Sequence, residues 1–201
     1  MSYLTICYWL MSYFVGTFMT AWWVGKWRNI DLREHRSGNL GARNAGAVIG
    51  KSAFLITSIG DGSKGLLIVL LGYLLNETEF SIAVAGALVI IGHLFPFWLK
   101  GKGGKGIATF VGVTLAFNPL LFLAFVVGFL IPIPFLKSAT LSMLLGYVCY
   151  IGSIIYSGCL PVAWPIVLII LIIVYKHRFD IIESYQEKAW KSKKITKKST
   201  L

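Results

Sequence analysis

Long apolar runs separated by short polar segments dominate the chain and predict an all-α protein of transmembrane helices. A helix needs about 20 apolar residues to cross a hydrocarbon core of about 30 Å, and several runs approach or reach that length. Glycine, proline and charged residues separate the runs. We predict apolar segments at Tyr3–Val24, Ser52–Ile59, Leu66–Leu75, Phe80–Leu99, Ile107–Ile131 with a break at Asn118 and Pro119, Leu141–Ile155 and Val162–Tyr175.

These segments give a polytopic bundle of roughly five to seven spans in a single domain, residues 1–201. The glycine-rich stretch at 60–65 is interpreted as a polar break between two short runs, which places Asp61 and Lys64 near helix ends. Glu77 and Glu79 are also expected at helix ends. A transporter would carry ionisable residues inside its spans and duplicated halves, so this pattern counts against a transporter.

The composition agrees with a membrane protein, since 57% of the residues are hydrophobic and 13% are charged. Soluble domains are about 45–50% apolar and about 25% charged. The net charge of +11 would also fit a nucleic-acid-binding protein. The cations, however, lie between the apolar runs and in the tail, where Lys and Arg mark the cytoplasmic side. We therefore expect membrane lipids and no nucleic acid as partners, with the N-terminus outside and the C-terminus in the cytoplasm.

The first polar segment, residues 31–44, combines glycine, serine and asparagine with arginines. Glycine lets a backbone approach a ligand closely, and the forked donors of arginine suit phosphate. An ordinary cytoplasmic loop explains the same residues equally well. The third segment, Lys176–Asp180, would by itself be no more than the basic flank of the last crossing.

The second polar segment is more specific, because Lys100–Gly106 holds four glycines and three lysines before a predicted helix. Free backbone N–H groups and the helix dipole make such a position an anion site. It is not a nucleotide-binding P-loop, since no Gly-Lys pair is followed by Ser or Thr. A flexible basic loop held by lipid phosphates is the alternative. We interpret His93 as a hydrogen-bonded structural residue, since no carboxylate lies near it in the sequence.

Taken together and in this order, the three segments resemble the bacterial acyl-phosphate:glycerol-3-phosphate acyltransferase family. Residues 36–44 read RSGNLGARN and are similar to that family's GSGNxGATN motif. Residues 92–109 read GHLFPFWLKGKGGKGIAT and are similar to its GHxFPxxLxxKGGKG(V/I)AT motif. Residues 176–181 read KHRFDI and match the third motif, RHxxNI, in part.

The chain departs from these motifs at five positions. In the first motif and just after it, the chain has Arg36 where the family has glycine, Arg43 where it has threonine and Ala47 where it has arginine. In the third motif and just after it, the chain has Asp180 where the family has asparagine and Glu183 where it has arginine. Two cations expected near the phosphates are thus missing, and Arg36 and Arg43 are candidates to replace them. A catalytically silent or acceptor-shifted paralogue is therefore the alternative to an active enzyme.

The resemblance implies a seven-span enzyme of the bacterial plasma membrane, multi-pass, with its active site facing the cytoplasm. It would transfer a fatty acyl group from acyl phosphate to the sn-1 hydroxyl of glycerol 3-phosphate, giving lysophosphatidate for phospholipid biosynthesis. No cofactor and no metal are implied, and a partner enzyme would supply the acyl phosphate. No histidine begins the His-x4-Asp pair of the acyl-CoA-dependent acyltransferases, which argues against that class.

The resemblance also implies the roles of the site residues. Lys105 would hold a phosphate, Ser37 would orient the reacting groups or transfer a proton, and His177 would be a phosphate or proton partner. His93 is expected to orient the second loop. The expected substrate-binding residues are Arg36, Gly38, Asn39, Gly41, Arg43, Asn44, His93, Lys102, Gly103, Gly104, Gly106 and Asp180.

Overall fold

A computed structural model describes residues 2–187, and this part of the chain contains helices and no strand. The all-α prediction is thus confirmed, while the basic tail beyond residue 187 and the C-terminus lie outside the described residues. The elements in chain order are α1 (Tyr3–Gly16), α2 (Thr20–Trp27), η1 (Leu32–Glu34), α3 (Ala42–Val48), α4 (Lys51–Leu74), α5 (Glu79–Leu94), η2 (Phe97–Leu99), α6 (Ile107–Phe117), α7 (Pro119–Leu130), α8 (Ile133–Leu136), α9 (Ala139–Tyr156) and α10 (Leu160–Lys176).

Five stretches within the described residues are long and apolar enough to cross a membrane. A sixth candidate joins α10 to residues 178–187 across a bend of 56°. The multi-pass prediction is confirmed at five to six candidate spans, and α6 is a shorter apolar helix of 11 residues. The five stretches are Tyr3–Trp27, Lys51–Leu74, Glu79–Leu99, Pro119–Leu136 and Ala139–Tyr156.

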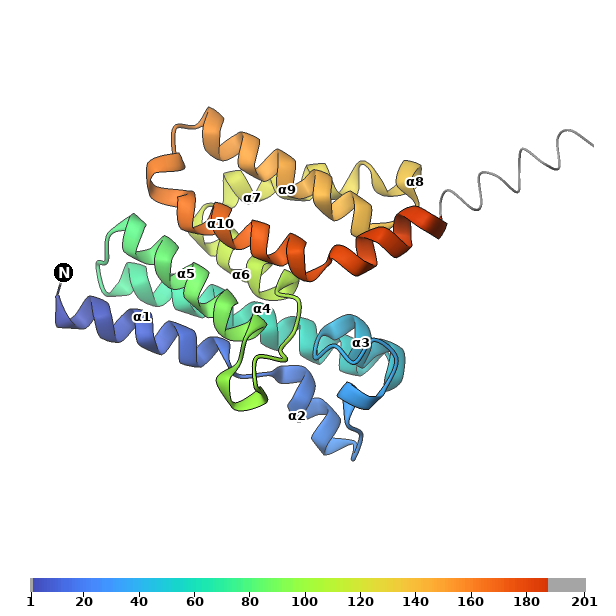
Figure 1. Cartoon of the computed structure of the whole chain (residues 1–201). Coiled ribbons are helices and arrows are strands. Elements are labelled where there is room, and N and C mark those ends of the chain that lie inside the picture. The colour runs from blue at the N-terminus through green and yellow to red at the C-terminus, as the bar shows by residue number, and fades with distance from the viewer. Residues whose placement is uncertain (1, 188–201) are drawn as a thin grey trace, which may run out of the picture.

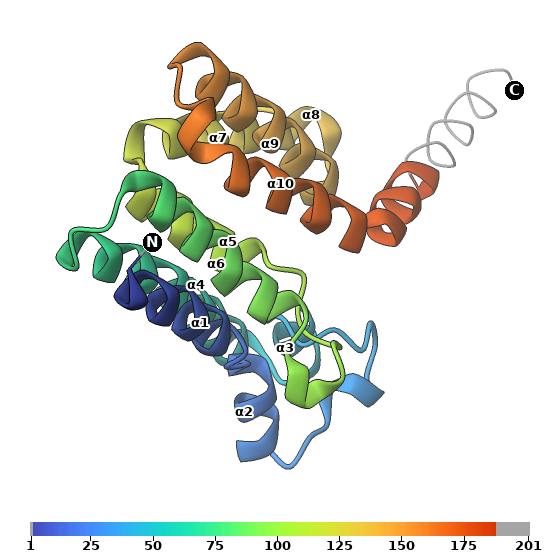
Figure 2. The same cartoon turned by 60° about the vertical axis from the view of Figure 1, so that its left-hand side comes forward.

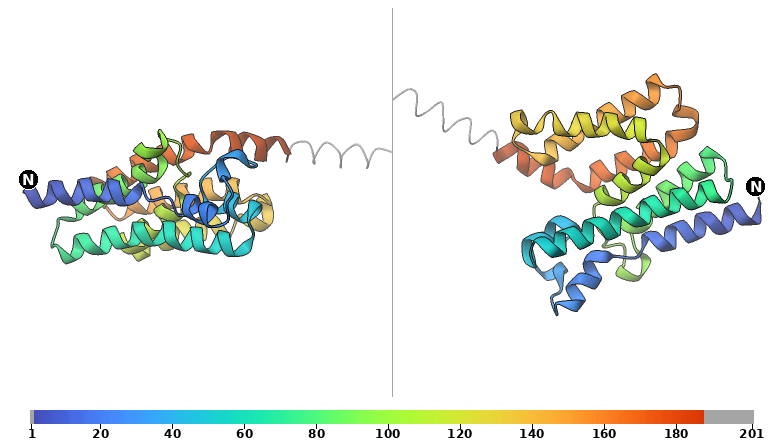
Figure 3. Two further views of the ribbon diagram at one scale, coloured as in Figure 1. Left: turned by 90° about the horizontal axis from the view of Figure 1, so that it is seen from below. Right: turned by 180° about the vertical axis from the view of Figure 1, so that it is seen from behind.

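The helices form an elongated bundle in two groups (Figures 1 and 3). One group contains α1, α4, α5 and α6, and the other contains α7 and α9, with α10 packed against both α5 and α9 (Figure 2). The N-terminus lies at one end of the bundle, while α3, α8 and the end of the described chain lie at the other (Figure 1). The shared core between the groups includes Phe110, which meets Phe125, Tyr147 and Tyr150 edge to face.

The outer surface of the bundle is apolar. Large hydrophobic side chains such as Leu74, Leu120 and Phe135 are about three-quarters or more exposed, at 78%, 80% and 77%. Soluble monomers do not present such continuous apolar surfaces to water, so lipid must cover this one. The chain is therefore an integral membrane protein.

Helix α4 is unbroken from Lys51 to Leu74, so the break predicted at residues 60–65 is wrong. The glycines of this stretch serve helix packing rather than a turn. A Cβ on Gly65 would lie 2.4 Å from the Thr109 carbonyl oxygen, and one on Gly112 would lie 1.9 Å from the Gly62 carbonyl oxygen. Small residues allow α4 and α6 this close approach, as is common between membrane helices.

Because α4 is unbroken, two charged residues lie inside the bundle. Asp61 and Lys64 are buried in the middle of α4, so their predicted position near helix ends is wrong. Glu77 and Glu79 do lie between α4 and α5 or at the first turn of α5, as predicted. The predicted break at Asn118 is confirmed too, since its Oδ1 accepts from the first N–H groups of α7 and caps that helix.

Candidate active site

The first polar segment turns sharply between α2 and α3. Arg36 and Gly38 both adopt left-handed backbone conformations, with φ of 51° and 64°. A residue with a side chain is disfavoured there, which gives a physical reason for the glycine that the related motif has in place of Arg36. Asn44 is buried and donates from Nδ2 to the Leu32 carbonyl at 2.9 Å, so this side chain shapes the loop.

Two further features fix the same segment. Gly41 precedes α3, and a Cβ there would lie 2.7 Å from Nδ2 of Asn39. Hydrogen bonds from Arg33 lower the pKa of Asp31 to about 2, so this carboxylate stays charged and balances Arg33. Arg43 forms no ion pair within residues 2–187 and remains a cation available to a ligand.

The second polar segment folds back tightly on the end of α5. The Gly104 N–H donates to the His93 carbonyl at 3.1 Å. A Cβ on Gly103 would lie 2.1 Å from that carbonyl oxygen, and one on Gly104 would lie 2.1 Å from Nε2 of His93. The glycines are thus required by the contact with His93, and the loop ends at Gly106, whose φ of 86° precedes α6.

The three polar segments meet, although residues 45–99 separate the first from the second and residues 107–175 the second from the third. Lys105 Nζ forms an ion pair with Asp180, which joins the second segment to the third. A Cβ on Gly104 would lie 2.9 Å from the Leu40 carbonyl oxygen, so the second segment also touches the first. The clustering that the motifs imply is therefore present in the fold.

His177 is buried just beyond the last residue of α10, within reach of the charges of Lys105, Asp180 and Arg43. Burial lowers the pKa of its ring, and the positive charges of Lys105 and Arg43 act in the same direction. The hydrogen bond to the Ile173 carbonyl, at 2.9 Å, and the charge of Asp180 oppose this shift. A lowered pKa favours the neutral form of the ring, which is the form that can accept a proton.

Three of the residues predicted from the motifs, Ser37, Arg36 and Lys102, are exposed. Among the described residues, no hydrogen bond or ion pair joins their side chains to Lys105 or His177. Lys176, in contrast, donates from Nζ to the Leu94 carbonyl at 3.2 Å and fixes the third segment to the end of α5.

Sequence reasoning missed the charged residues behind His93. Lys64 Nζ lies 2.8 Å from Nδ1 of His93, and Asp61 Oδ1 lies 3.7 Å from the same atom. No carboxylate lies near His93 in the sequence, but α4 packs against α5 and brings Asp61 close to it in the fold. Two charges three residues apart within an otherwise apolar stretch were the signal, since ionisable residues inside membrane spans mark functional sites.

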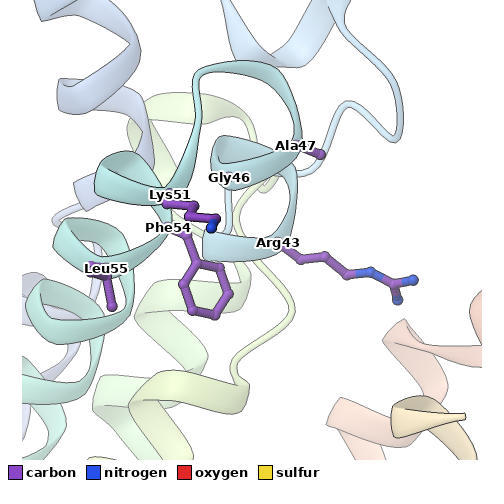
Figure 4. A pocket seen from close by; sticks show the side chains of 6 residues that line it. All are labelled: Arg43, Gly46, Ala47, Lys51, Phe54 and Leu55. Carbon is purple, nitrogen blue, oxygen red and sulfur yellow. The ribbon is translucent and has the colours of Figure 1, made fainter.

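An open pocket of about 400 Å³ lies beside the first segment (Figure 4). Its apolar part is formed by Phe54 and Leu55 at the start of α4, which are 45% and 56% exposed. Arg43 extends away from Lys51 and Phe54 (Figure 4), so the pocket has two separated cations at its edge. The lining residues are Arg43, Gly46, Ala47, Lys51, Phe54 and Leu55.

The sequence profile of the family described as glycerol-3-phosphate acyltransferase matches residues 6–187. The chain belongs to this glycerol-3-phosphate acyltransferase family. It is 40% identical over 173 residues to glycerol-3-phosphate acyltransferase 1 of Bacillus thuringiensis subsp. konkukian, covering 85% of this chain and 95% of the relative. The Listeria monocytogenes glycerol-3-phosphate acyltransferase is 35% identical over 175 residues, with 86% and 88% covered. The family that the three motifs predicted is confirmed.

The fold agrees with that membership. Crystal structures of PlsY (YgiH), an integral membrane glycerol 3-phosphate acyltransferase, match with TM-scores of 0.84 for the glycerol 3-phosphate form and 0.80 for the lysophosphatidic acid form. Both matches cover 92% of this chain and 93% of the crystallised chain, at 24% and 23% identity. The bundle is therefore the fold of this family of membrane enzymes.

Proposed function

We propose that the protein transfers a fatty acyl group from acyl phosphate to the sn-1 hydroxyl of glycerol 3-phosphate at the cytoplasmic face of a bacterial plasma membrane. The products are lysophosphatidate and inorganic phosphate. The observation that carries the proposal is the meeting of the three polar segments, since Lys105 pairs with Asp180 and Gly104 packs against the Leu40 carbonyl oxygen. The relatives named above bear the name of this activity.

The proposed chemistry is a single displacement at a carbonyl carbon. The sn-1 oxygen of the acceptor forms a bond to the acyl carbon, and the bond from that carbon to the phosphate oxygen breaks. The acceptor hydroxyl loses its proton, and the phosphate leaves with the electron pair. A free phosphate is a good leaving group, so the protein's main task is to hold two anions together and orient them.

The charges of the cluster fit this task. Two phosphates repel each other, and ammonium, guanidinium and backbone N–H donors offset that repulsion in a water-poor site. Lys105 and Arg43 supply the cations, and the glycine loop offers the N–H groups of Gly103 and Gly106, which form no backbone hydrogen bond among the described residues. We assign His177 to proton exchange with the acceptor or the leaving phosphate, and Ser37 to orientation of the reacting groups.

The open pocket offers a surface for the acyl chain. Phe54 and Leu55 are exposed apolar side chains near the end of a span, so a chain can enter from the lipid while its phosphate stays close to Arg43. An apolar wall with a cation at its edge is what an acyl phosphate requires.

The deciding experiment is acyl transfer by the purified protein in lipid vesicles, with radiolabelled acyl phosphate and glycerol 3-phosphate. We expect labelled lysophosphatidate, and no product when acyl-CoA replaces acyl phosphate. Binding of both substrates without product would favour the silent paralogue. Product from another polyol phosphate but not from glycerol 3-phosphate would favour an acceptor-shifted enzyme. Movement of a solute across the vesicle membrane without acyl transfer would favour a transporter.

Asp180→Asn is expected to lower the KM for glycerol 3-phosphate by about threefold to fivefold, in line with a partly exposed ion pair. The carboxylate now neutralises Lys105 and repels an incoming phosphate, whereas an amide keeps a hydrogen-bond acceptor without the charge. Steady-state kinetics with varied acceptor measure the change. Glu183→Gln, which removes an exposed carboxylate three residues after Asp180, is the control and should leave KM unchanged. An unchanged or higher KM in Asp180→Asn would contradict this role.

Leu55→Trp is expected to lower kcat/KM for long-chain acyl phosphate by about tenfold. The larger side chain would fill the pocket, so the acyl chain would lose a few of its apolar contacts with the pocket wall. Activity with a short-chain acyl phosphate should change little. Leu67→Trp is the matched control, because Leu67 is 60% exposed on the same helix and does not line the pocket. Equal loss with short and long donors would remove the pocket from the acyl-chain assignment.

A further inference from the structure

A single buried ammonium group contacts three parts of the bundle. Lys64 Nζ donates to the carbonyl oxygens of Gly16 and Phe18 at 2.9 and 2.7 Å and to Nδ1 of His93 at 2.8 Å. The Asp61 carboxylate lies 3.2 Å from it and supplies the opposite charge. All three N–H bonds of the ammonium are thus used, and the group links the break between α1 and α2, the middle of α4 and the end of α5.

This arrangement is costly for a membrane helix. The Lys64 and Asp61 side chains are only 6% and 2% exposed. The Thr20 hydroxyl also donates a hydrogen bond to Oδ1 of Asp61 at 3.0 Å. Apolar residues of similar size would usually serve stability at least as well as a buried ion pair. Ionisable groups inside membrane helices are by default functional, and these two do not touch the cation cluster at Lys105 directly.

The link between the two groups is the imidazole of His93. An ammonium group has no lone pair and can only donate, so Nδ1 must accept and the proton of the neutral ring is on Nε2. Nε2 faces Gly104, where an added Cβ would come within 2.1 Å, and the His93 carbonyl accepts the Gly104 N–H at 3.1 Å. The ring therefore forms the surface on which the glycine loop rests, directly before Lys105.

We propose that Asp61 and Lys64 are positioning residues for the acyl-transfer site, and that they act through His93. They fix the tautomer and orientation of the ring, the ring fixes the glycine loop, and the loop places Lys105. The hydrogen bonds of Lys64 to the Gly16 and Phe18 carbonyl oxygens hold its ammonium group in place beside the ring. This inference rests on the proposed function but concerns residues outside the three motifs.

The alternative is that the buried pair only stabilises the bundle. In that case its removal would lower the fraction of folded protein, while the folded molecules would keep their kinetic constants. A positioning role differs because kcat/KM of the folded enzyme falls, and because the loss depends on the presence of His93. These two outcomes separate the roles.

A double-mutant cycle tests the inference. One arm is Asp61→Asn with Lys64→Gln, which removes both charges and leaves no unpaired ion, and the other arm is His93→Gln. Each arm should lower kcat/KM for glycerol 3-phosphate by about 10- to 100-fold, the loss expected when a reacting group is displaced by about 1 Å. The combined variant should be no worse than His93→Gln alone, because the pair acts through that ring.

Glu77→Gln is the matched control, since Glu77 accepts from Thr5 at 2.9 Å in a polar contact far from His93 along the spans. It should leave both kinetic constants unchanged. Size-exclusion profiles and thermal unfolding in detergent establish that each variant is folded. Independent, multiplicative losses in the combined variant, or a folded Asp61→Asn and Lys64→Gln enzyme with wild-type kcat/KM, would overturn the inference. Absence of acyl transfer in the wild-type protein would instead refute the proposed function.

Discussion

Lys105→Gln is expected to lower kcat/KM for acyl transfer by about 100- to 1,000-fold, the range seen when one charge-stabilising donor is removed from an active site. Lys105 is the one cation of the second segment that the structure pairs with the third, through Asp180. Its ammonium is held where the three segments meet, so it is placed to offset the repulsion of two phosphates. Steady-state kinetics with each substrate varied in turn measure the loss.

The matched control for this prediction is Lys100→Gln. Lys100 belongs to the same loop and carries the same charge, but it is exposed and has no contact with the third segment among the described residues. It should keep most of the activity. Full acyl transfer by a folded Lys105→Gln enzyme would show that Lys105 has no part in the mechanism. Equal losses in the two variants would show that only the total positive charge of the loop matters, not the position of Lys105.

Gly104→Ala is expected to lower kcat/KM by about 100-fold, because a displacement of about 1 Å at a reacting group has that effect. The new Cβ would come within 2.1 Å of Nε2 of His93 and 2.9 Å of the Leu40 carbonyl oxygen. One of these neighbours must therefore move, and both belong to the site. The loop that carries Lys105 would shift, while the rest of the bundle would remain packed.

Gly152→Ala is the control for the glycine substitution, since a Cβ there meets no atom within 4 Å. It lies in α9, and alanine favours a helix over glycine by about 1 kcal/mol, so its stability should be equal or higher. Thermal unfolding and kinetics of the two variants distinguish a local effect from a general one. Wild-type kinetics in a folded Gly104→Ala protein would show that the loop tolerates displacement.

The helices could be predicted from the sequence wherever apolar length alone decides the structure. The break at Asn118 and Pro119 was also predictable, because a cap residue followed by proline has one common use. The glycines of residues 60–65 could not be interpreted correctly, since glycine serves a turn and a close helix contact equally well. Only the partner helix, α6, decides between the two.

The site divides in the same way. The motifs predicted that three distant segments carry the chemistry, and the fold brings Lys105, Asp180 and His177 together. The link between Lys64 and His93 was not predictable, because it joins residues 29 positions apart through the packing of α4 against α5. The left-handed backbone of Arg36 explains why the family motif has glycine at this position. It does not explain why this chain has arginine there.

The central claim is that the three polar segments form one phosphate-binding site on one face of the membrane. Labelling of single introduced cysteines with a membrane-impermeant maleimide, after replacement of the three native cysteines, tests it most directly. In inside-out vesicles, Ser37→Cys and Lys102→Cys should both react, and glycerol 3-phosphate should slow the reaction of Ser37→Cys. Tyr156→Cys, 96% exposed at the end of α9 away from α8, should react only in right-side-out vesicles. Reaction of Ser37→Cys and Lys102→Cys from opposite sides of the membrane would contradict the claim.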